Sequence, residues 1–215
     1  MSHARFPLPP HLCDAHLAPG FSEFSGVVLE DLSAVHPEQR HWLFNYVLNQ
    51  LTHSVKPKYR ELAFNHLRRA QGALDAYHQL RRLLGEYGAP GKRARSYFPA
   101  LDQAEICVSF AAQAFELSNK LLLLSGDTPV YQHASEQELT TLRSFYIACK
   151  HVANMLDGSQ FEAPDTVVFW FTQEGLQSRK RGVLTYQSLA NVLRELAYDA
   201  SVLASYISPV PESGT

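Results

Sequence analysis

Residues 58–87, KYRELAFNHLRRAQGALDAYHQLRRLLGEY, decide the fold class of this chain. Apolar residues recur about every 3.5 positions, which is the spacing of one face of an α-helix. Gly88, Pro90 and Gly91 follow at once and end the pattern. The stretch therefore predicts one long amphipathic helix, whose apolar positions are Ala63, Leu67, Ala70, Leu74, Tyr77 and Leu84.

Four further segments have helical periodicity, so helices dominate the chain. The segment after Ser135 opens with a capping box that ends in Glu138. Only residues 166–172 are rich in β-branched and aromatic residues, and an extended piece at 182–184 is predicted to pair with them across the turn at 179–181. We predict an all-α fold, an antiparallel bundle of about five helices with at most one short β-hairpin. The four segments cover about residues 37–54, 99–124, 135–156 and 185–207.

The chain has 215 residues, of which 46% are hydrophobic, enough to bury one large core. Five prolines and glycines between Pro7 and Gly20 prevent regular structure near the start, although apolar residues follow them. Residues 1–35 are therefore predicted to form an irregular arm packed on the body. Residues 36–207 are predicted to form a single helical bundle domain, and residues 208–215 a disordered tail.

Charge and cysteine content exclude several classes of protein. The formal net charge is −2, so the chain is not basic overall, and three scattered cysteines do not make a disulfide framework. No apolar run is long enough to cross a membrane and no signal peptide is visible. We therefore expect a cytoplasmic protein with no membrane contact.

A cluster of possible metal ligands lies in the arm, at His11, Cys13, Asp14 and His16. Structural zinc sites usually combine two separated pairs of ligands, and no second pair is present here. The prediction is therefore no metal and no cofactor, with a metal-dependent enzyme that uses this arm as the weakest alternative.

Positive charge is concentrated in residues 56–95, which hold ten Lys or Arg and three Asp or Glu, a net charge of +7. Such a segment favours binding to a polyanion such as RNA. A solvated helix face or an interface to an acidic protein partner would give the same pattern. The predicted nucleic-acid-binding residues are Arg68, Arg69, Arg81, Arg82, Lys92, Arg93 and Arg95.

The predicted fourth helix carries the most suggestive set of polar residues. Arg143, Ile147 and Lys150 share one stripe, and Tyr146 and His151 flank it. Cationic side chains beside a histidine could bind a phosphate and move a proton. The alternative is that Tyr146 and His151 are ordinary bundle residues and that the two cations face solvent.

The C-terminal part of the chain, about residues 139–207, resembles bacterial proteins of the HEPN-like class. The resemblance implies a helical bundle, a homodimer and, in many members, a metal-independent ribonuclease of toxin–antitoxin or phage-defence systems with an Arg-x4–6-His motif. It lies in the run Leu-Arg-x-x-Tyr-x-x-x-Lys-His that ends at His151, then in Pro164, Trp170-x4-Gly175-Leu176 and Leu184-Thr185-Tyr186-x-x-Leu189.

The sequence departs from that motif at its arginine. Tyr146 stands five residues before His151, and Arg143 stands eight residues before it. The literal match, Arg60-x5-His66, places its two side chains about 120° away from each other around a helix. We therefore predict an RNA- or nucleotide-associated protein with weak or absent cleavage, in which any catalysis uses His151, Lys150, Arg143 and Tyr146. The alternative is a catalytically inert protein whose basic segment binds an acidic partner.

Overall fold

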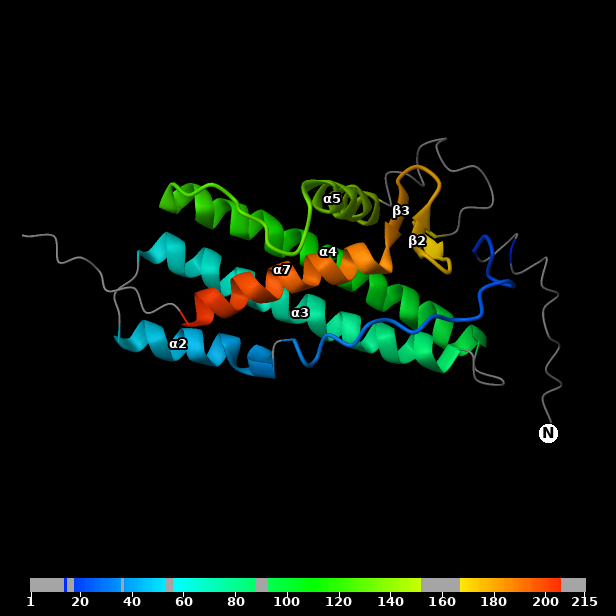
Figure 1. Cartoon of the computed structure of the whole chain (residues 1–215), viewed down its shortest axis with the longest axis horizontal. Coiled ribbons are helices and arrows are strands. Elements are labelled where there is room, and N and C mark those ends of the chain that lie inside the picture. The colour runs from blue at the N-terminus through cyan, green and yellow to red at the C-terminus, as the bar shows by residue number, and fades with distance from the viewer. Residues whose placement is uncertain are drawn as a thin grey trace, which may run out of the picture.

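The computed structural model describes residues 14, 18–35, 37–52, 56–87, 93–151 and 167–205. Within them the chain forms five α-helices, a short 3-10 helix and a small sheet, so the predicted mostly α class is confirmed (Figure 1). No helix in this part of the chain is both long and apolar enough to cross a membrane. The helices are η1 (Pro37–His41), α2 (Trp42–Thr52), α3 (Pro57–Tyr87), α4 (Arg93–Ser125), α5 (Glu136–Lys150) and α7 (Tyr186–Ser205).

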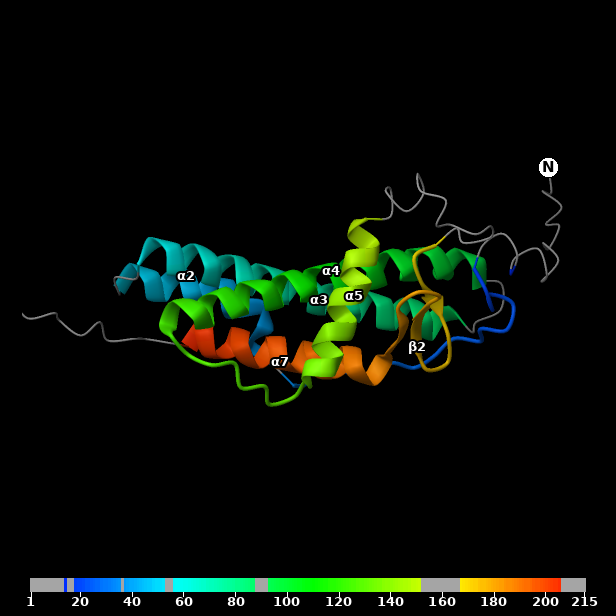
Figure 2. The ribbon, with the colours of Figure 1, turned by 90° about the horizontal axis from the view of Figure 1, so that it is seen from above.

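The two longest helices, α3 and α4, lie side by side and form the centre of the molecule (Figures 1 and 2). They approach closely at Gly72, where an added Cβ would stand 2.5 Å from the ring of Phe110. The guanidinium of Arg69 lies over the same ring, 4.6 Å from its centroid. Phe110 of α4 therefore packs against two residues of α3 that are one helical turn apart, and a larger residue at position 72 would force the helices apart.

The chain before α2 packs along α3 in extended form (Figure 1). Gly26 has a φ of +92°, and a Cβ there would stand 3.1 Å from the carbonyl oxygen of Leu84, so both conformation and space favour glycine. The segment before α2 buries five apolar side chains on the body, those of Ala18, Phe21, Phe24, Leu29 and Leu32. Detaching the segment would expose them to water.

The sheet has three antiparallel strands in the order β1 (Trp170–Phe171), β2 (Gly175–Ser178) and β3 (Gly182–Thr185). The predicted single hairpin was wrong in its pairing, because Leu176 of β2 pairs with Phe171 on one side and Leu184 on the other. Thr172 and Gly175 close the first turn, where the Thr172 N–H donates to the Gly175 carbonyl oxygen at 2.9 Å. That turn lies at residues 172–175, before the turn at 179–181 across which the sequence pattern paired the two segments.

The two largest differences between predicted and observed helix ends are at the start of α4 and at the end of α5. α4 begins at Arg93, and Pro99, predicted as its first residue, lies inside it. Burial of Tyr97 explains the early start, because its ring is fully buried against Phe21, at 4.7 Å, and Phe171, at 5.3 Å. α5 ends at Lys150, six residues before the predicted end.

Helix α5 does not run along the long axis of the molecule. Figure 2 shows that it crosses α4 and α7 at a steep angle, whereas α3, α4 and α7 follow the long axis. Helix α2 lies on the opposite side of the molecule from α5 and contacts α7, where the Asn49 amide donates to the Ala204 carbonyl oxygen at 2.8 Å (Figure 1). The predicted tail, residues 208–215, lies outside the described residues.

Candidate functional site

Helix α5 presents the cations that the sequence singled out. Arg143 and Lys150 are exposed, and Ile147 between them is 37% exposed. The spacing of seven residues places the two cations on one side of the helix, about 10 Å apart along its axis. Tyr146 is half-buried and packs against the core, so it lies beside this face rather than on it.

His151 is exposed and forms the C-cap of α5, where its backbone N–H donates to the Ile147 carbonyl oxygen at 3.1 Å. A cation at the C-terminal end of a helix also stabilises the partial negative charge there. Lys150 and His151 can therefore stabilise the C-terminal end of α5, whether or not they also bind a ligand. The structure places Lys150 and His151 at the C-terminal end of α5 and Arg143 about two turns before them, with all three exposed to solvent.

The neighbouring thiol is not available as a nucleophile. Burial, reinforced by the nearby Glu105 carboxylate, raises the pKa of Cys149 to about 12, so the thiol stays protonated at neutral pH.

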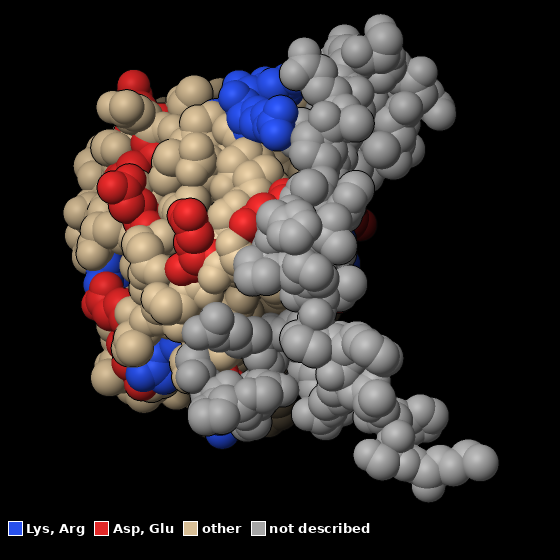
Figure 3. All heavy atoms as spheres, turned by 90° about the vertical axis from the view of Figure 1, so that its right-hand side faces the viewer, with Lys and Arg blue, Asp and Glu red and all other residues tan. Residues whose placement is uncertain are grey.

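Helix α5 docks on the sheet, and this docking adds a second basic group to the same side of the molecule. The Phe145 ring of α5 lies 5.8 Å from the ring of Phe169, just before β1, and α5 contacts β3 directly. The turn between β2 and β3 consists of Arg179, Lys180 and Arg181, all exposed. Figure 3 shows Lys and Arg side chains gathered at the upper edge of this end of the molecule.

We call this set the α5 surface. It comprises Arg143, Lys150 and His151 from α5 and Arg179, Lys180 and Arg181 from the turn. No Asp or Glu occurs between positions 140 and 151 or between 176 and 185, so neither segment carries a negative side chain. The basic turn, interpreted from sequence as a solvated loop, leads into β3, and β3 contacts α5. The sequence pattern alone does not reveal that contact.

A buried carboxylate on α7 fixes the start of α5. Glu195 is 1% exposed, and its Oε2 accepts hydrogen bonds from three consecutive backbone N–H groups, those of Gln132 at 2.8 Å, His133, and Ala134 at 3.1 Å. The predicted capping box follows directly, with the Ser135 N–H donating to Glu138 at 2.7 Å. The loop before α5 is therefore held by charge-assisted hydrogen bonds.

A second carboxylate lies one turn further along α7. Asp199 accepts a hydrogen bond from the Ser118 hydroxyl at 2.8 Å. Burial raises its pKa to about 6, the nearby Glu195 carboxylate adds to the effect, and the Ser118 hydrogen bond opposes it.

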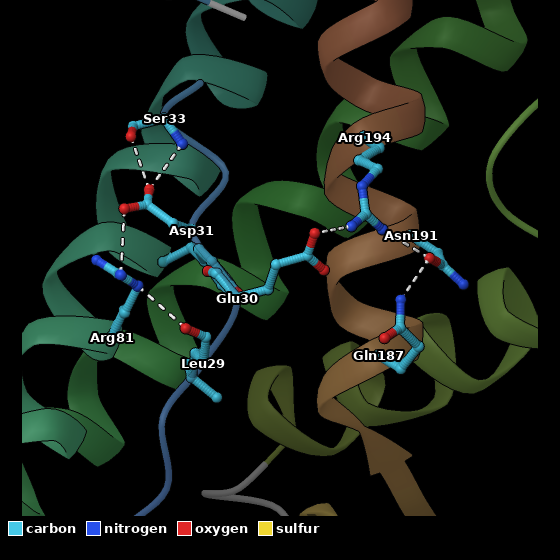
Figure 4. A network of polar contacts seen from close by, with 9 residues as sticks. Leu29, Glu30, Asp31, Ser33, Arg81, Gln187, Asn191 and Arg194 are labelled. Atoms are coloured by element: carbon cyan, nitrogen blue, oxygen red, sulfur yellow. Dashed lines mark hydrogen bonds and ion pairs between the residues drawn. The ribbon is translucent and has the colours of Figure 1, made fainter. Parts of the chain in front are cut away.

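Helix α7 makes polar contacts with both α5 and the N-terminal arm, and Figure 4 shows those with the arm. The Asn191 amide donates to Glu138 of α5 at 3.0 Å and its oxygen accepts from Arg194 at 2.9 Å. Arg194 forms an ion pair with Glu30 of the arm. A continuous set of polar contacts therefore joins the arm, α7 and the first turn of α5.

The basic residues predicted on α3 are largely engaged within the chain. Arg81 donates from Nε to the Leu29 carbonyl oxygen at 3.0 Å and forms an ion pair with Asp31 at 3.1 Å. Arg82 pairs with Glu86 at 3.0 Å, and Arg69 covers Phe110.

Arg68 is exposed on α3, and Asp75 is exposed two turns further along the same side. The described part of α3 therefore has no continuous basic stripe. Three further predicted residues cannot be placed on the surface: Lys92 lies outside the described residues, as do the side chains of Arg93 and Arg95.

The literal Arg60-x5-His66 match does not form a site. Arg60 is exposed, whereas His66 is fully buried with its Nδ1 3.0 Å from the Ala114 carbonyl oxygen. Burial lowers the pKa of His66 to about 4, against the opposing effect of that hydrogen bond, so the ring is neutral at physiological pH.

No group of three His, Cys, Asp or Glu residues in the described part of the chain is placed to hold a metal ion. Of the predicted cluster in the arm, only Asp14 is described, and it accepts hydrogen bonds from the backbone and the hydroxyl of Ser22. His11, Cys13 and His16 lie outside the described residues.

No protein-family model, curated protein or solved structure shows a significant match to this chain.

Proposed function

We propose that this protein is a HEPN-like, RNA-associated protein of a bacterial defence or toxin–antitoxin type that binds the phosphate backbone of RNA on its α5 surface. The observation that carries the proposal is the contact of α5 with β3, because β3 follows the basic turn at 179–181 and α5 carries Arg143, Lys150 and His151, all of them exposed. Lys and Arg side chains provide most of the affinity of proteins for nucleic acid, through neutralisation of phosphates.

The geometry supports binding to a chain of phosphates better than catalysis on one phosphate. Arg143 and Lys150 lie about 10 Å apart along α5, which suits neighbouring groups of a polymer. Catalysis of phosphoryl transfer relies on groups that are preorganised around one reacting atom and shielded from water. We therefore expect weak or absent cleavage of total RNA by the purified protein. Strong metal-independent cleavage that is abolished in His151→Ala would instead establish an enzyme.

The test of binding is fluorescence anisotropy with short random-sequence RNA, comparing two variants with the same change of net charge. Arg143→Glu/Lys150→Glu reverses two exposed cations of α5. Arg60→Glu/Arg68→Glu reverses two exposed cations of α3 and is the matched control. We expect the first variant to bind at least about tenfold more weakly and the control to bind within about twofold of wild type.

Three outcomes would contradict the proposal: no binding by the wild type, equal loss in both variants, or unchanged binding by the α5 variant. The alternative function, an inert protein that binds an acidic protein partner through residues 56–95, predicts the reverse order of effects. In that case the α3 variant would lose its partner, and the α5 variant would keep it.

A further inference from the structure

Three helices meet at the end of the molecule that lies opposite the sheet. Helix α2 ends there, α3 begins there and α4 ends there (Figures 1 and 2). His66 of α3 contacts the carbonyl oxygen of Ala114 of α4 at 3.0 Å, and the two helices run antiparallel. Residues 123–124 of α4 therefore lie beside the first turn of α3.

Large apolar side chains are exposed at this end. Leu123 and Leu124 are 80% and 47% exposed, and Val47 and Leu48, in the second half of α2, are 46% and 44% exposed. Several such side chains on neighbouring elements mark an interaction surface.

Exposed cations accompany these apolar side chains. They come from the start of α3 and the end of α4, and they are Lys56, Lys58, Arg60 and Lys120. The segments 56–64 and 119–127 hold two acidic residues beside these four cations, Glu61 and Asp127. We call the four cations together with Val47, Leu48, Leu123 and Leu124 the α2–α4 end.

We propose that the α2–α4 end binds the surface of an anionic lipid bilayer. A bilayer surface accepts both kinds of side chain at once, because apolar groups enter the acyl boundary and cations contact the anionic headgroups. Lys and Arg suit this position, since their stems lie along apolar surface while the charged ends stay in water. A protein that lies on the interface needs no helix that spans the membrane.

The combination of groups favours a lipid surface over a protein partner. A second copy of this surface would bring two sets of cations together, and like charges across an interface weaken binding. An acidic protein would pair with the cations but would also need an apolar surface shaped to fit side chains from separate helices. A fluid bilayer needs no complementary shape.

This inference is independent of the proposed RNA binding. The sheet and its basic turn lie at the other end of the long axis (Figures 1 and 2). A molecule bound to a bilayer through the α2–α4 end therefore keeps the basic turn away from the lipid.

The test of the cations is co-sedimentation of the full chain with vesicles of phosphatidylcholine, alone or with about one quarter of the anionic lipid phosphatidylglycerol. We expect binding to the anionic vesicles to be at least about tenfold tighter and to weaken with added salt. Lys58→Glu/Lys120→Glu should weaken it at least about tenfold, because each cation near an anionic surface adds to the affinity. The matched control, Arg143→Glu/Lys150→Glu, has the same change of net charge and should bind these vesicles within about twofold of wild type.

A second pair of variants tests the apolar side chains at constant charge. Leu123→Ser/Leu124→Ser should bind the anionic vesicles at least about fivefold more weakly, because it removes side chains that enter the bilayer. The control is Val28→Ser/Val183→Ser, which changes two valines of the arm and β3 that are 86% and 36% exposed. It should bind as the wild type does, and circular dichroism should show unchanged helical content in every variant.

No binding of the wild type to anionic vesicles would overturn the proposal. Equal losses in the two charge-reversal variants would also overturn it, because they would indicate attraction of the whole molecule rather than of one surface. Unchanged binding by Leu123→Ser/Leu124→Ser would do the same, since it would indicate contact through charge alone. Loss of vesicle binding by Lys58→Glu/Lys120→Glu with RNA binding retained would support the proposal and separate this surface from the α5 surface.

Discussion

The arm–α7–α3 contacts and the α5 surface use charged side chains in opposite ways. Where the arm crosses α3 and α7, Glu30, Asp31, Arg81 and Arg194 all have partners within the chain (Figure 4). On the α5 surface, Arg143 and Lys150 extend into solvent from segments without acidic residues.

The difference teaches that a concentration of basic residues in a sequence does not by itself locate a binding surface. Residues 56–95 have the highest positive charge in the sequence, yet Arg69, Arg81 and Arg82 contact groups of the same chain. The shorter basic segment of α5 keeps both of its cations, Arg143 and Lys150, exposed to solvent. Substitutions of single charged residues can therefore test whether charges with partners in the chain contribute to stability rather than to RNA binding.

The largest effect is expected at Glu195. Glu195→Ala removes the acceptor of three backbone N–H groups in a buried setting, so the free energy of unfolding should fall by about 3 kcal/mol. Urea denaturation measures the loss. Glu195→Gln keeps an oxygen acceptor without the charge and should lose less than half as much. A negligible effect of the alanine variant would mean that the loop before α5 does not depend on α7.

The next effect concerns Asp199 and depends on pH. The pKa of Asp199 is raised from 3.8 to about 6 in the folded protein, so the folded state retains a proton that the unfolded state has lost. Its contribution to stability is fully present below about pH 4 and is lost as the pH rises through about 6. At pH 7, Asp199→Asn should therefore be more stable than wild type by roughly 1 to 2 kcal/mol.

The measurement is the difference in unfolding free energy between Asp199→Asn and wild type at several pH values. Using the difference removes the opposite contribution of His66, whose lowered pKa makes the fold lose stability as the pH falls from 6.5 towards 4. A difference that does not change with pH would show that Asp199 titrates as an ordinary exposed carboxyl.

A smaller effect is expected at Arg81, which holds the arm on α3. Arg81→Ala removes a charge-assisted hydrogen bond to Leu29 and a half-exposed ion pair with Asp31, so stability should fall by about 1 kcal/mol. Binding to RNA should stay within about twofold of wild type, since the side chain already has its partners. Thermal unfolding measures the effect on stability, and fluorescence anisotropy on the same samples measures the effect on RNA binding. A large loss of RNA binding with unchanged stability would mean that Arg81 binds RNA rather than holding the arm on α3.

The smallest effect is expected at Arg82, whose ion pair with Glu86 is exposed on α3. Arg82→Ala should change stability by less than about 0.5 kcal/mol, because exposed i, i+4 pairs are screened by water and salt. RNA binding should also be unchanged. A clear loss of binding here would move the proposed surface from α5 to α3.

Periodicity alone determined the helical class of this protein and the approximate extent of α3 and α7. Their apolar residues recur at helical spacing, and both helices begin and end within about two residues of the predicted positions. The capping box at Ser135 and Glu138 could likewise be predicted from the sequence, because its hydrogen bonds join residues three apart in sequence. Local rules suffice wherever the interacting groups are near neighbours in the chain.

Only the tertiary structure decided the features that depend on distant contacts. Burial of Tyr97 extends α4 past Pro99, and β2 separates the two segments that the sequence pattern paired. The partners of Arg81 and Arg194 lie 50 and 164 positions away, so no local pattern distinguishes these residues from Arg143. The charge of a side chain follows from its chemistry, whereas its exposure to solvent and its partners follow from the packing of the whole chain.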